Sequence, residues 1–230
     1  MDDKHGPPDT SLPFEDARRE MVARQIERRG IRDERVLQAM LLVPRHLFVP
    51  EEYVNASYTD EPLPIGDRQT ISQPFMVAAM AEALLLKGPE RVLEIGAGSG
   101  YQAAVLSRLA REVIAIEAQP TLVPRARERL ARLGYANVRL EEADGSMGWS
   151  QDAPYDAILV TAAAPSVPPP LVEQLADGGR LVLPVGGAEN QELIRITKSE
   201  GRTSQESLYA CRFVPLIGRY GWQDRQIQRG

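Results

Sequence analysis

The pattern of apolar and polar residues changes at Gly88-Pro89, and the two parts of the chain predict different structures. Between residues 14 and 40, apolar positions recur at helical spacing and are interrupted near Gly30, which predicts two helices. Asp33 is placed to cap the second of them. After Pro89, short apolar runs alternate with amphipathic stretches, as strands and helices do in a parallel sheet covered on both faces. We therefore expect an α/β fold preceded by N-terminal helices.

The strands and helices of this sheet can be placed by residue number. Strands are expected at 91–95, 112–117, 138–142, 156–161 and 180–185, with helices at 101–110, 122–133 and 171–175. Pro124 lies within the second helix, so we expect that helix to begin after Leu122. The last two strands, at 192–197 and 208–214, have no helix between them, which predicts an antiparallel pair at one side of the sheet.

The stretch before the sheet is harder to assign. Residues 43–74 are rich in proline and lack periodicity, which predicts a long ordered crossing segment that adds no sheet layer, followed by a helix at 75–86. Residues 1–14 are polar and proline-rich, and we expect a disordered tail there. The remaining residues, 15–230, are expected to form one domain, with a cover at 15–88, an α/β core at 89–218 and a C-terminal tail at 219–230.

Charge and composition restrict the partners. The chain has 32 acidic and 27 basic side chains, a formal net charge of −5, so it lacks the general positive field that gathers nucleic acid. Arginines between residues 108 and 139 are interpreted as a solvated helix face interleaved with acids. No apolar run approaches the roughly 20 residues that span a membrane, and no membrane partner is expected.

Cysteine and histidine are scarce. The single cysteine, Cys211, cannot form an intrachain disulfide, and the N-terminus has no apolar signal segment, so we expect a cytoplasmic protein. Together with His5 and His46 it supplies too few ligands for a zinc site, and no metal is predicted. His46 is interpreted as a packed or capping residue.

A glycine-rich turn is the main candidate for ligand binding. Gly96, Gly98 and Gly100 follow the strand at 91–95 and precede a helix that starts near Tyr101. Glycines at this position let a ligand approach the backbone closely. Alone, such a turn is a weak signal, because it also serves nucleotides or tight packing. Its spacing is one residue shorter than the dinucleotide pattern G-x-G-x-x-G, and no P-loop lysine motif is present.

Acids at successive strand ends narrow the choice of ligand. Glu94 precedes the turn, where a carboxylate repels a pyrophosphate but attracts the ammonium group of an amino-acid-bearing cofactor. Glu117 ends the next strand, where it can accept hydrogen bonds from ribose hydroxyls. Asp144 follows the third and is placed to reach an adenine amino group, while Gly145 leaves room for the ring. These residues predict S-adenosylmethionine and a Rossmann-like methyltransferase sheet, mostly parallel with an antiparallel C-terminal pair.

The chain resembles the protein-L-isoaspartate (D-aspartate) O-methyltransferases from about Met21 to Gly218. Among the segments that carry the resemblance, Thr-Ile-Ser-Gln-Pro is the most specific, and the glycine turn is shared by many methyltransferases. The segments are Val43-Pro-Arg-His-Leu-Phe-Val-Pro50, Gln69-Thr-Ile-Ser-Gln-Pro74, Val92-Leu-Glu-Ile-Gly-Ala-Gly-Ser-Gly-Tyr101, Tyr155-Asp-Ala-Ile-Leu-Val-Thr-Ala-Ala-Ala-Pro165, Gly178-Gly-Arg-Leu-Val-Leu-Pro-Val-Gly186 and Arg212-Phe-Val-Pro-Leu-Ile217.

The resemblance implies an activity and a set of residues. It implies methylation of the free α-carboxylate of L-isoaspartyl, and by extension D-aspartyl, residues in damaged proteins, which starts repair through a succinimide. Ser72 corresponds to the family's active-site serine, Thr70 and Ile71 to residues beside the cofactor, and the Val214-Pro215 backbone to the wall against the substrate. The acceptor carboxylate is already ionised at pH 7, so no general base is needed. A monomer is expected.

Three questions stay open at this stage. Ser72 precedes Gln-Pro and the helix at 75–86, so it is also a candidate helix cap. Gly66-Asp67-Arg68-Gln69 departs from the family pattern, which leaves a methyltransferase for a small carboxylate or hydroxyl as an alternative. A binding module without turnover is a further alternative, although it predicts loss of Ser72, which is present.

Overall fold

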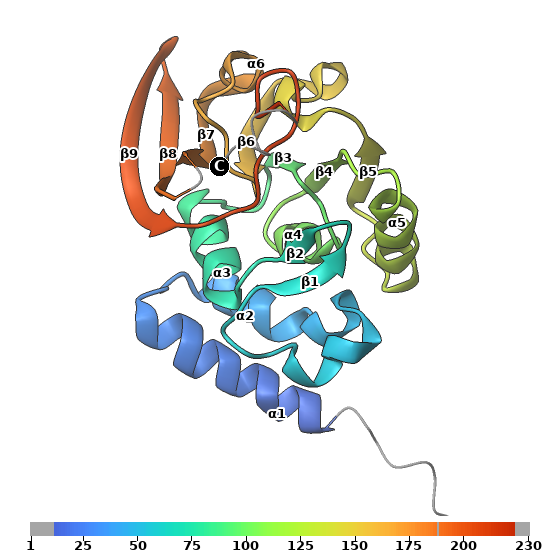
Figure 1. Cartoon of the computed structure of the whole chain (residues 1–230). Coiled ribbons are helices and arrows are strands. Elements are labelled where there is room, and N and C mark those ends of the chain that lie inside the picture. Colours follow the sequence, from blue (N-terminus) through green and yellow to red (C-terminus); the bar gives the residue numbers. More distant parts are fainter. Residues whose placement is uncertain (1–11, 188, 224–230) are drawn as a thin grey trace, which may run out of the picture.

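A seven-stranded sheet forms the centre of the protein, shown in Figure 1 as a computed structural model that describes residues 12–187 and 189–223. Its strand order is β5-β4-β3-β6-β7-β8-β9, parallel from β5 to β7 and antiparallel at β8 and β9. The strands are β3 Arg91–Ile95, β4 Glu112–Glu117, β5 Val138–Glu142, β6 Tyr155–Val160, β7 Leu175–Gly186, β8 Gln191–Ser199 and β9 Arg202–Cys211. The predicted mostly parallel sheet with an antiparallel C-terminal pair is confirmed.

Side chains that alternate along the strands supply the two faces of the sheet with separate apolar clusters. On one face, Val92 and Ala115 belong to a cluster that includes α3 Pro74–Ala83, α4 Tyr101–Ser107 and α5 Leu122–Arg132. On the other face, Leu93 and Ile114 pack in a second cluster with α6 Pro169–Glu173. Both faces are therefore covered, which is why the parallel strands consist of near-continuous apolar residues.

The N-terminal segment packs beneath the α3 and α4 side of the sheet (Figure 1). Helix α1 spans Leu12–Glu20 and continues through a π-helical turn at Met21–Ile26 and a 3-10 turn at Glu27–Arg29. The left-handed Gly30, with φ of 109°, ends this run, and α2 follows at Glu34–Leu42. As predicted, Asp33 caps α2: its side chain accepts a hydrogen bond from the Arg35 backbone N–H.

One prediction for this region is wrong and another is confirmed. The predicted tail at 1–14 is wrong at its last residues, because 12–14 already belong to α1, and residues 1–11 lie outside the described part of the chain. His46 is a packed residue: its ring stacks on Phe14 at 4.4 Å, and its Nδ1 lies 2.8 Å from the Tyr58 hydroxyl. None of the described helices is long and apolar enough to cross a membrane.

The crossing segment contains a β-hairpin that the sequence analysis missed. After 3-10 turns at Arg45–Phe48 and Glu51–Ala56, strands β1 Leu63–Gly66 and β2 Gln69–Ile71 pair as a separate two-stranded sheet. Asp67 and Arg68 form its two-residue turn, both with positive φ, 50° and 60°. Such turns match the twist of a hairpin but favour Asn-Gly or Asp-Gly, so Asp-Arg gave little signal.

Several element boundaries also differ from prediction: the helices predicted at 75–86, 101–110 and 171–175 span Pro74–Ala83, Tyr101–Ser107 and Pro169–Glu173, and β7 and β8 are longer than predicted. Two further boundaries have a clear physical reason. Helix α5 starts at Leu122, because Pro124 lies in its first turn, where the proline's missing N–H would have no helical partner. Strand β9 ends at Cys211 and not at Val214, and it begins earlier than predicted, at Arg202. Its residues are mostly exposed and polar, because β9 is the edge of the sheet, so the apolar pattern could not locate it.

Candidate functional site

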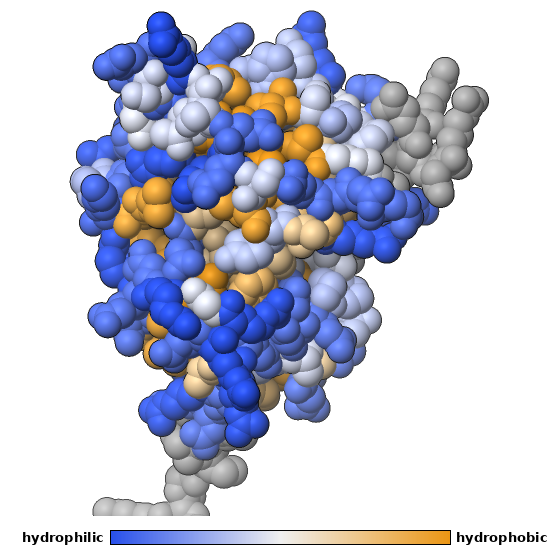
Figure 2. Space-filling view, turned by 90° about the vertical axis from the view of Figure 1, so that its left-hand side faces the viewer, coloured by the Kyte–Doolittle hydropathy of each residue, from blue (hydrophilic) through white to orange (hydrophobic). Residues whose placement is uncertain are grey.

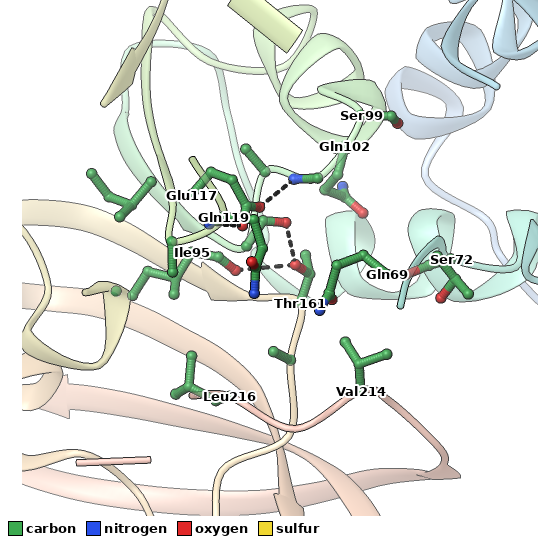
Figure 3. Close-up of a pocket in the computed structure, with 18 of the residues that line it drawn as sticks. Gln69, Ser72, Ile95, Ser99, Gln102, Glu117, Gln119, Thr161, Val214 and Leu216 are labelled. Carbon is green, nitrogen blue, oxygen red and sulfur yellow. Dashed lines mark hydrogen bonds between the residues drawn. The ribbon is translucent and has the colours of Figure 1, made fainter. Parts of the chain in front are cut away.

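A cavity lies at the carboxyl ends of β3, β4 and β6, where the strand order reverses around β3 (Figure 3). Ligands bind at such switch points in open α/β sheets. Strand β2 and the following residues close it on one side, and the segment after β9 closes it on the other. Of the predicted site residues, those lining it are Thr70, Ile71, Ser72, Gly96, Gly98, Glu117, Gly145, Val214 and Pro215.

The glycine turn at the base of this cavity is held by backbone hydrogen bonds. Gly96 N–H and Ala97 N–H both donate to the Ile116 carbonyl on the neighbouring strand, at 2.8 and 3.0 Å. A Cβ on Gly96 would lie 2.5 Å from Thr161 Oγ1, and one on Gly98 would lie 3.1 Å from Ile65 Cδ1 in the hairpin. Close approach and positive φ therefore both favour glycine at position 96, whereas at position 98 the positive φ is the main constraint, because the end of the Ile65 side chain can shift.

Gly100 has a different role from the other two glycines. It does not line the cavity, and a Cβ there would meet the Leu130 side chain of α5 at 3.2 Å. Its φ of 87° starts helix α4. This position therefore serves helix packing, and its predicted cofactor contact stays a prediction.

Glu117 is the predicted acid that lines the cavity most directly. Its side chain is 6% exposed, and its two oxygens accept backbone N–H groups: Oε2 from Gly98 at 2.7 Å and Oε1 from Gln119 at 2.9 Å. The carboxylate thus joins the glycine turn to the end of β4. Each oxygen keeps a further acceptor site for a ligand hydroxyl.

Glu94 lies behind the cavity wall and has no hydrogen-bond partner in the described structure. It is fully buried, both of its oxygens are unpaired, and burial, with the nearby Glu117 charge, raises its pKa well above the ordinary value of 4.5. The side-chain amide of Gln102 on α4 is likewise buried and unpaired, and Gln102 lines the cavity. Unpaired buried polar groups beside a cavity fit a polar, cationic ligand that would pair with them.

Asp144 and Gly145 follow β5, at the edge of the same cavity. Asp144 Oδ1 accepts from the backbone N–H and the hydroxyl of Ser146, and Oδ2 accepts from Arg219 N–H at 2.8 Å. This carboxylate ties the C-terminal segment to the site without lining the cavity, and its predicted adenine contact stays a prediction. A Cβ on Gly145 would lie 2.3 Å from Ile95 Cγ2, so only glycine fits between β3 and the cavity.

Ser72 faces the cavity with a free hydroxyl. The N-cap of α3 is Gln73 and makes no side-chain capping bond, so the capping alternative for Ser72 is wrong. Ser72 is half-buried, and its hydroxyl has no hydrogen-bond partner among the described residues. Figure 3 shows Ser72 and Gln69 on one side of the cavity and Val214 and Leu216 on the other.

The Val214-Pro215 wall is formed by loop and not by the last strand. The Val214 carbonyl accepts Ala163 N–H at 2.8 Å, and Leu216 N–H donates to the Ala163 carbonyl at 2.8 Å. Strand β9 ends at Cys211, and the chain then crosses beyond the end of β6, where Pro215 forms an isolated parallel bridge with Ala163.

The sequence analysis missed Thr161 as a site residue. Thr161 Oγ1 lies 2.6 Å from the Gly96 carbonyl and 3.0 Å from the Ile95 carbonyl, so it fixes the entrance of the glycine turn. The sequence offered one signal for it: Thr161 is a polar residue at the end of the strand predicted at 156–161. Gln69 on β2, Gln102 on α4 and Gln119 after β4 were missed as well, because nothing in their spacing marks a glutamine as cavity-facing.

Comparison with known proteins decides the family. A sequence model of the protein-L-isoaspartate(D-aspartate) O-methyltransferase family matches residues 16–221. The chain belongs to this family. It is 55% identical over 212 residues to the protein-L-isoaspartate O-methyltransferase of Geobacter metallireducens, covering 92% of this chain and 98% of the relative. It is 54% identical over 211 residues to that of Methanoculleus marisnigri, covering 92% and 96%.

Solved structures of protein-L-isoaspartate O-methyltransferases have the same fold. One matches with a TM-score of 0.81 and 30% identity, covering 89% of this chain and 67% of the other. A Plasmodium falciparum structure in complex with S-adenosyl-L-homocysteine matches with a TM-score of 0.76 and 28% identity, covering 87% and 98%. The expected Rossmann-like methyltransferase fold and family membership are confirmed. In the described residues of this protein-L-isoaspartate O-methyltransferase family member, no three His, Cys, Asp or Glu side chains gather as a metal site would need.

Proposed function

We propose that this chain transfers a methyl group from S-adenosylmethionine to the free α-carboxylate of L-isoaspartyl residues in damaged proteins, and that D-aspartyl residues are a second acceptor. The resulting ester starts repair through a succinimide. The observation that carries the proposal is that Thr70, Ile71 and Ser72, the most family-specific segment, line the same cavity as the glycine turn.

The residues around the cavity fit the cofactor. Gly96 and Gly98 would let it approach the backbone, Glu117 would accept from its ribose, and the buried, unpaired amide of Gln102 would meet its charged amino-acid end. Glu94 does not line the cavity, and its contact with the cofactor stays a prediction. S-adenosylmethionine supplies, when bound, a methyl group made electrophilic by a positively charged sulfur. The Plasmodium falciparum relative contains S-adenosyl-L-homocysteine, the product form of this cofactor, which supports the proposal.

The chain's own residues then have mainly a positioning task. The acceptor carboxylate is ionised at neutral pH, so no side chain has to remove a proton from it. Ser72 would donate its free hydroxyl hydrogen to one carboxylate oxygen and leave the other as the nucleophile. Val214 and Thr161 border the same space and would restrict water around the reacting atoms.

Asp67 and Arg68, the departure from the family pattern, do not argue for a different acceptor. Neither residue lines this cavity or the groove beside it. They form the tip of the hairpin, and the Asp67 carboxylate accepts a hydrogen bond from the Thr121 hydroxyl at the start of α5. Their place in the fold is structural, and the isoaspartyl acceptor is favoured over a small molecule.

The test is methyl transfer to paired peptides. A peptide with one L-isoaspartyl residue and the same peptide with normal aspartate are incubated with radiolabelled S-adenosylmethionine. We expect label only in the isoaspartyl peptide, and Ser72→Ala should lower its incorporation. Equal labelling of both peptides, or none in either, would contradict the proposal. The cytoplasmic location, the monomeric state and the lack of nucleic-acid or membrane partners stay predictions from the sequence.

A further inference from the structure

A groove adjoins the proposed reaction site and is used by nothing described so far. Thr70, Ser72, Thr161 and Val214 line both the groove and the cofactor cavity, so the two spaces meet at the proposed acceptor position. From there the groove runs between the start of α3 and the end of β9. Figure 2 shows that the side of the molecule carrying β9 exposes apolar surface between hydrophilic regions.

One wall of the groove is a contiguous row of three side chains from distant parts of the sequence. Tyr209 on β9 meets Phe75 on α3 edge to face, with ring centroids 5.6 Å apart. The Arg29 guanidinium lies over the Phe75 ring, with its central carbon 3.7 Å from the ring centroid. This stacking holds the guanidinium plane in place at the groove, although the Arg29 side chain remains 42% exposed.

Arg29 has donors to spare. Its Nη1 donates to Asp60 Oδ2 at 2.7 Å, while Nε and Nη2 have no hydrogen-bond partner among the described residues. Arg212, 76% exposed, adds a second positive charge to the groove lining, and its only described ion pair is a 3.9 Å contact with the exposed Glu189. No Asp or Glu occurs among the described residues that line the groove. The groove therefore offers positive charge and apolar surface to a polypeptide.

We propose that this groove binds the residues next to the isoaspartate of the substrate polypeptide and selects a carboxylate side chain there through Arg29. The inference rests on the proposed function and adds a sequence preference to it. A peptide whose isoaspartyl carboxylate reaches Ser72 can extend along this groove, because the groove continues from that position. A neighbouring Glu or Asp would take the free donors of Arg29, and a neighbouring Lys would be repelled.

The experiment compares three isoaspartyl peptides that differ only in a flanking Glu, Gln or Lys, placed in turn before and after the isoaspartate. In at least one of the two positions, we expect kcat/KM to be about two- to fivefold higher for Glu than for Gln, and lower again for Lys, with the difference in KM. Arg29→Gln should reduce the Glu-to-Gln ratio to near one, and Arg29→Glu should invert it. Arg28→Gln is the matched control, because Arg28 is on the same turn, is exposed and does not line the groove.

Two further measurements keep the test decisive if the Arg29 variants fold poorly. In the wild type, the preference should disappear at about 1 M salt, where the Debye length is about 3 Å. Asp60→Asn leaves the Arg29 charge uncompensated and should increase the preference for Glu. Equal rates with all three peptides, or a preference unchanged in Arg29→Gln, would overturn the groove proposal. The proposed function would still be supported in that case, provided that the Gln peptide is methylated. Failure to methylate any isoaspartyl peptide would overturn the function itself.

Discussion

Replacement of Glu117 by Gln tests whether the end of β4 holds the cofactor. The substitution keeps the size of the side chain but turns one of its two acceptor oxygens into an NH2 group. In the structure both oxygens are in use, one by Gly98 N–H at 2.7 Å and the other by Gln119 N–H at 2.9 Å. One of these backbone donors must therefore face another donor in the variant, and the ligand loses a charged acceptor.

The size of the effect follows from these two bonds. Hydrogen bonds to charged groups contribute about 1.5 to 3 kcal/mol, and stranding a buried donor costs about 1 to 3 kcal/mol. We expect the binding free energy of S-adenosylhomocysteine to fall by about 1 to 3 kcal/mol, which is roughly a 5- to 150-fold increase in its dissociation constant. A loss in folding stability is expected as well, because the stranded backbone donor is present without the ligand.

Titration calorimetry with S-adenosylhomocysteine measures the binding loss, and thermal unfolding measures the stability loss. Glu142→Gln is the matched control: Glu142 is opposite Glu117 in the β4–β5 register, but it is exposed and does not line the cavity. The control should bind like the wild type. If the folded Glu117→Gln variant bound with unchanged affinity, the assignment of Glu117 to the cofactor would be refuted.

Three other substitutions separate catalysis, charge burial and backbone strain. Ser72→Ala should lower kcat for an isoaspartyl peptide and leave S-adenosylhomocysteine binding and the melting temperature nearly unchanged, because the hydroxyl has no hydrogen-bond partner in the described structure; a cooperative loss of fold would contradict this. Because the pKa of Glu94 is raised in the folded protein, the free energy of unfolding of the wild type should be highest below pH 4.5 and should fall as pH rises through the folded-state pKa. Glu94→Gln lacks this loss, so in urea unfolding it should become progressively more stable than the wild type with rising pH. If the difference in free energy of unfolding between Glu94→Gln and the wild type were constant from pH 4 to 8, the raised pKa of Glu94 would be contradicted. Arg68→Gly should raise the free energy of unfolding by up to about 1 kcal/mol, since Arg68 has a φ of 60°, and an unchanged denaturation midpoint would count against strain there.

The parallel core was predictable from the sequence because both faces of its strands are buried. Strand β3 was placed at Arg91–Ile95 and β4 at Glu112–Glu117, as the structure has them. Such strands consist of apolar runs with abrupt ends, and glycine marks the turn that follows. The edge strand β9 and the β1–β2 hairpin lack this signal, since one is polar and exposed and the other has short strands around an Asp67-Arg68 turn.

Sequence spacing placed the site residues at the strand ends, but it could not predict which of their side chains point into the cavity. Glu94 and Ile95 are neighbours in sequence, but alternation along β3 turns them to opposite faces, so Ile95 lines the cavity and Glu94 lies behind its wall. Asp144 does not line the cavity; its oxygens accept hydrogen bonds from Ser146 and Arg219, and its predicted adenine contact stays a prediction. Only the folded backbone determines which carboxylate faces the crevice.

The position of the hairpin gives the N-terminal cover a direct part in the proposed chemistry. Thr70 and Ser72 come from the cover, whereas Thr161 and Val214 come from the sheet and the C-terminal segment, and these four residues border both the cofactor cavity and the peptide groove. A methyl group passing from one space to the other has to cross this boundary. An α/β core starting at residue 89 would keep the glycine turn and Glu117 but lose the hairpin, Ser72 and Arg29. It would therefore lack Thr70 and Ile71 from the wall of the cofactor cavity, the hydroxyl donor for the acceptor carboxylate, and Arg29 from the groove. The N-terminal cover thus contributes to both the cofactor cavity and the peptide groove.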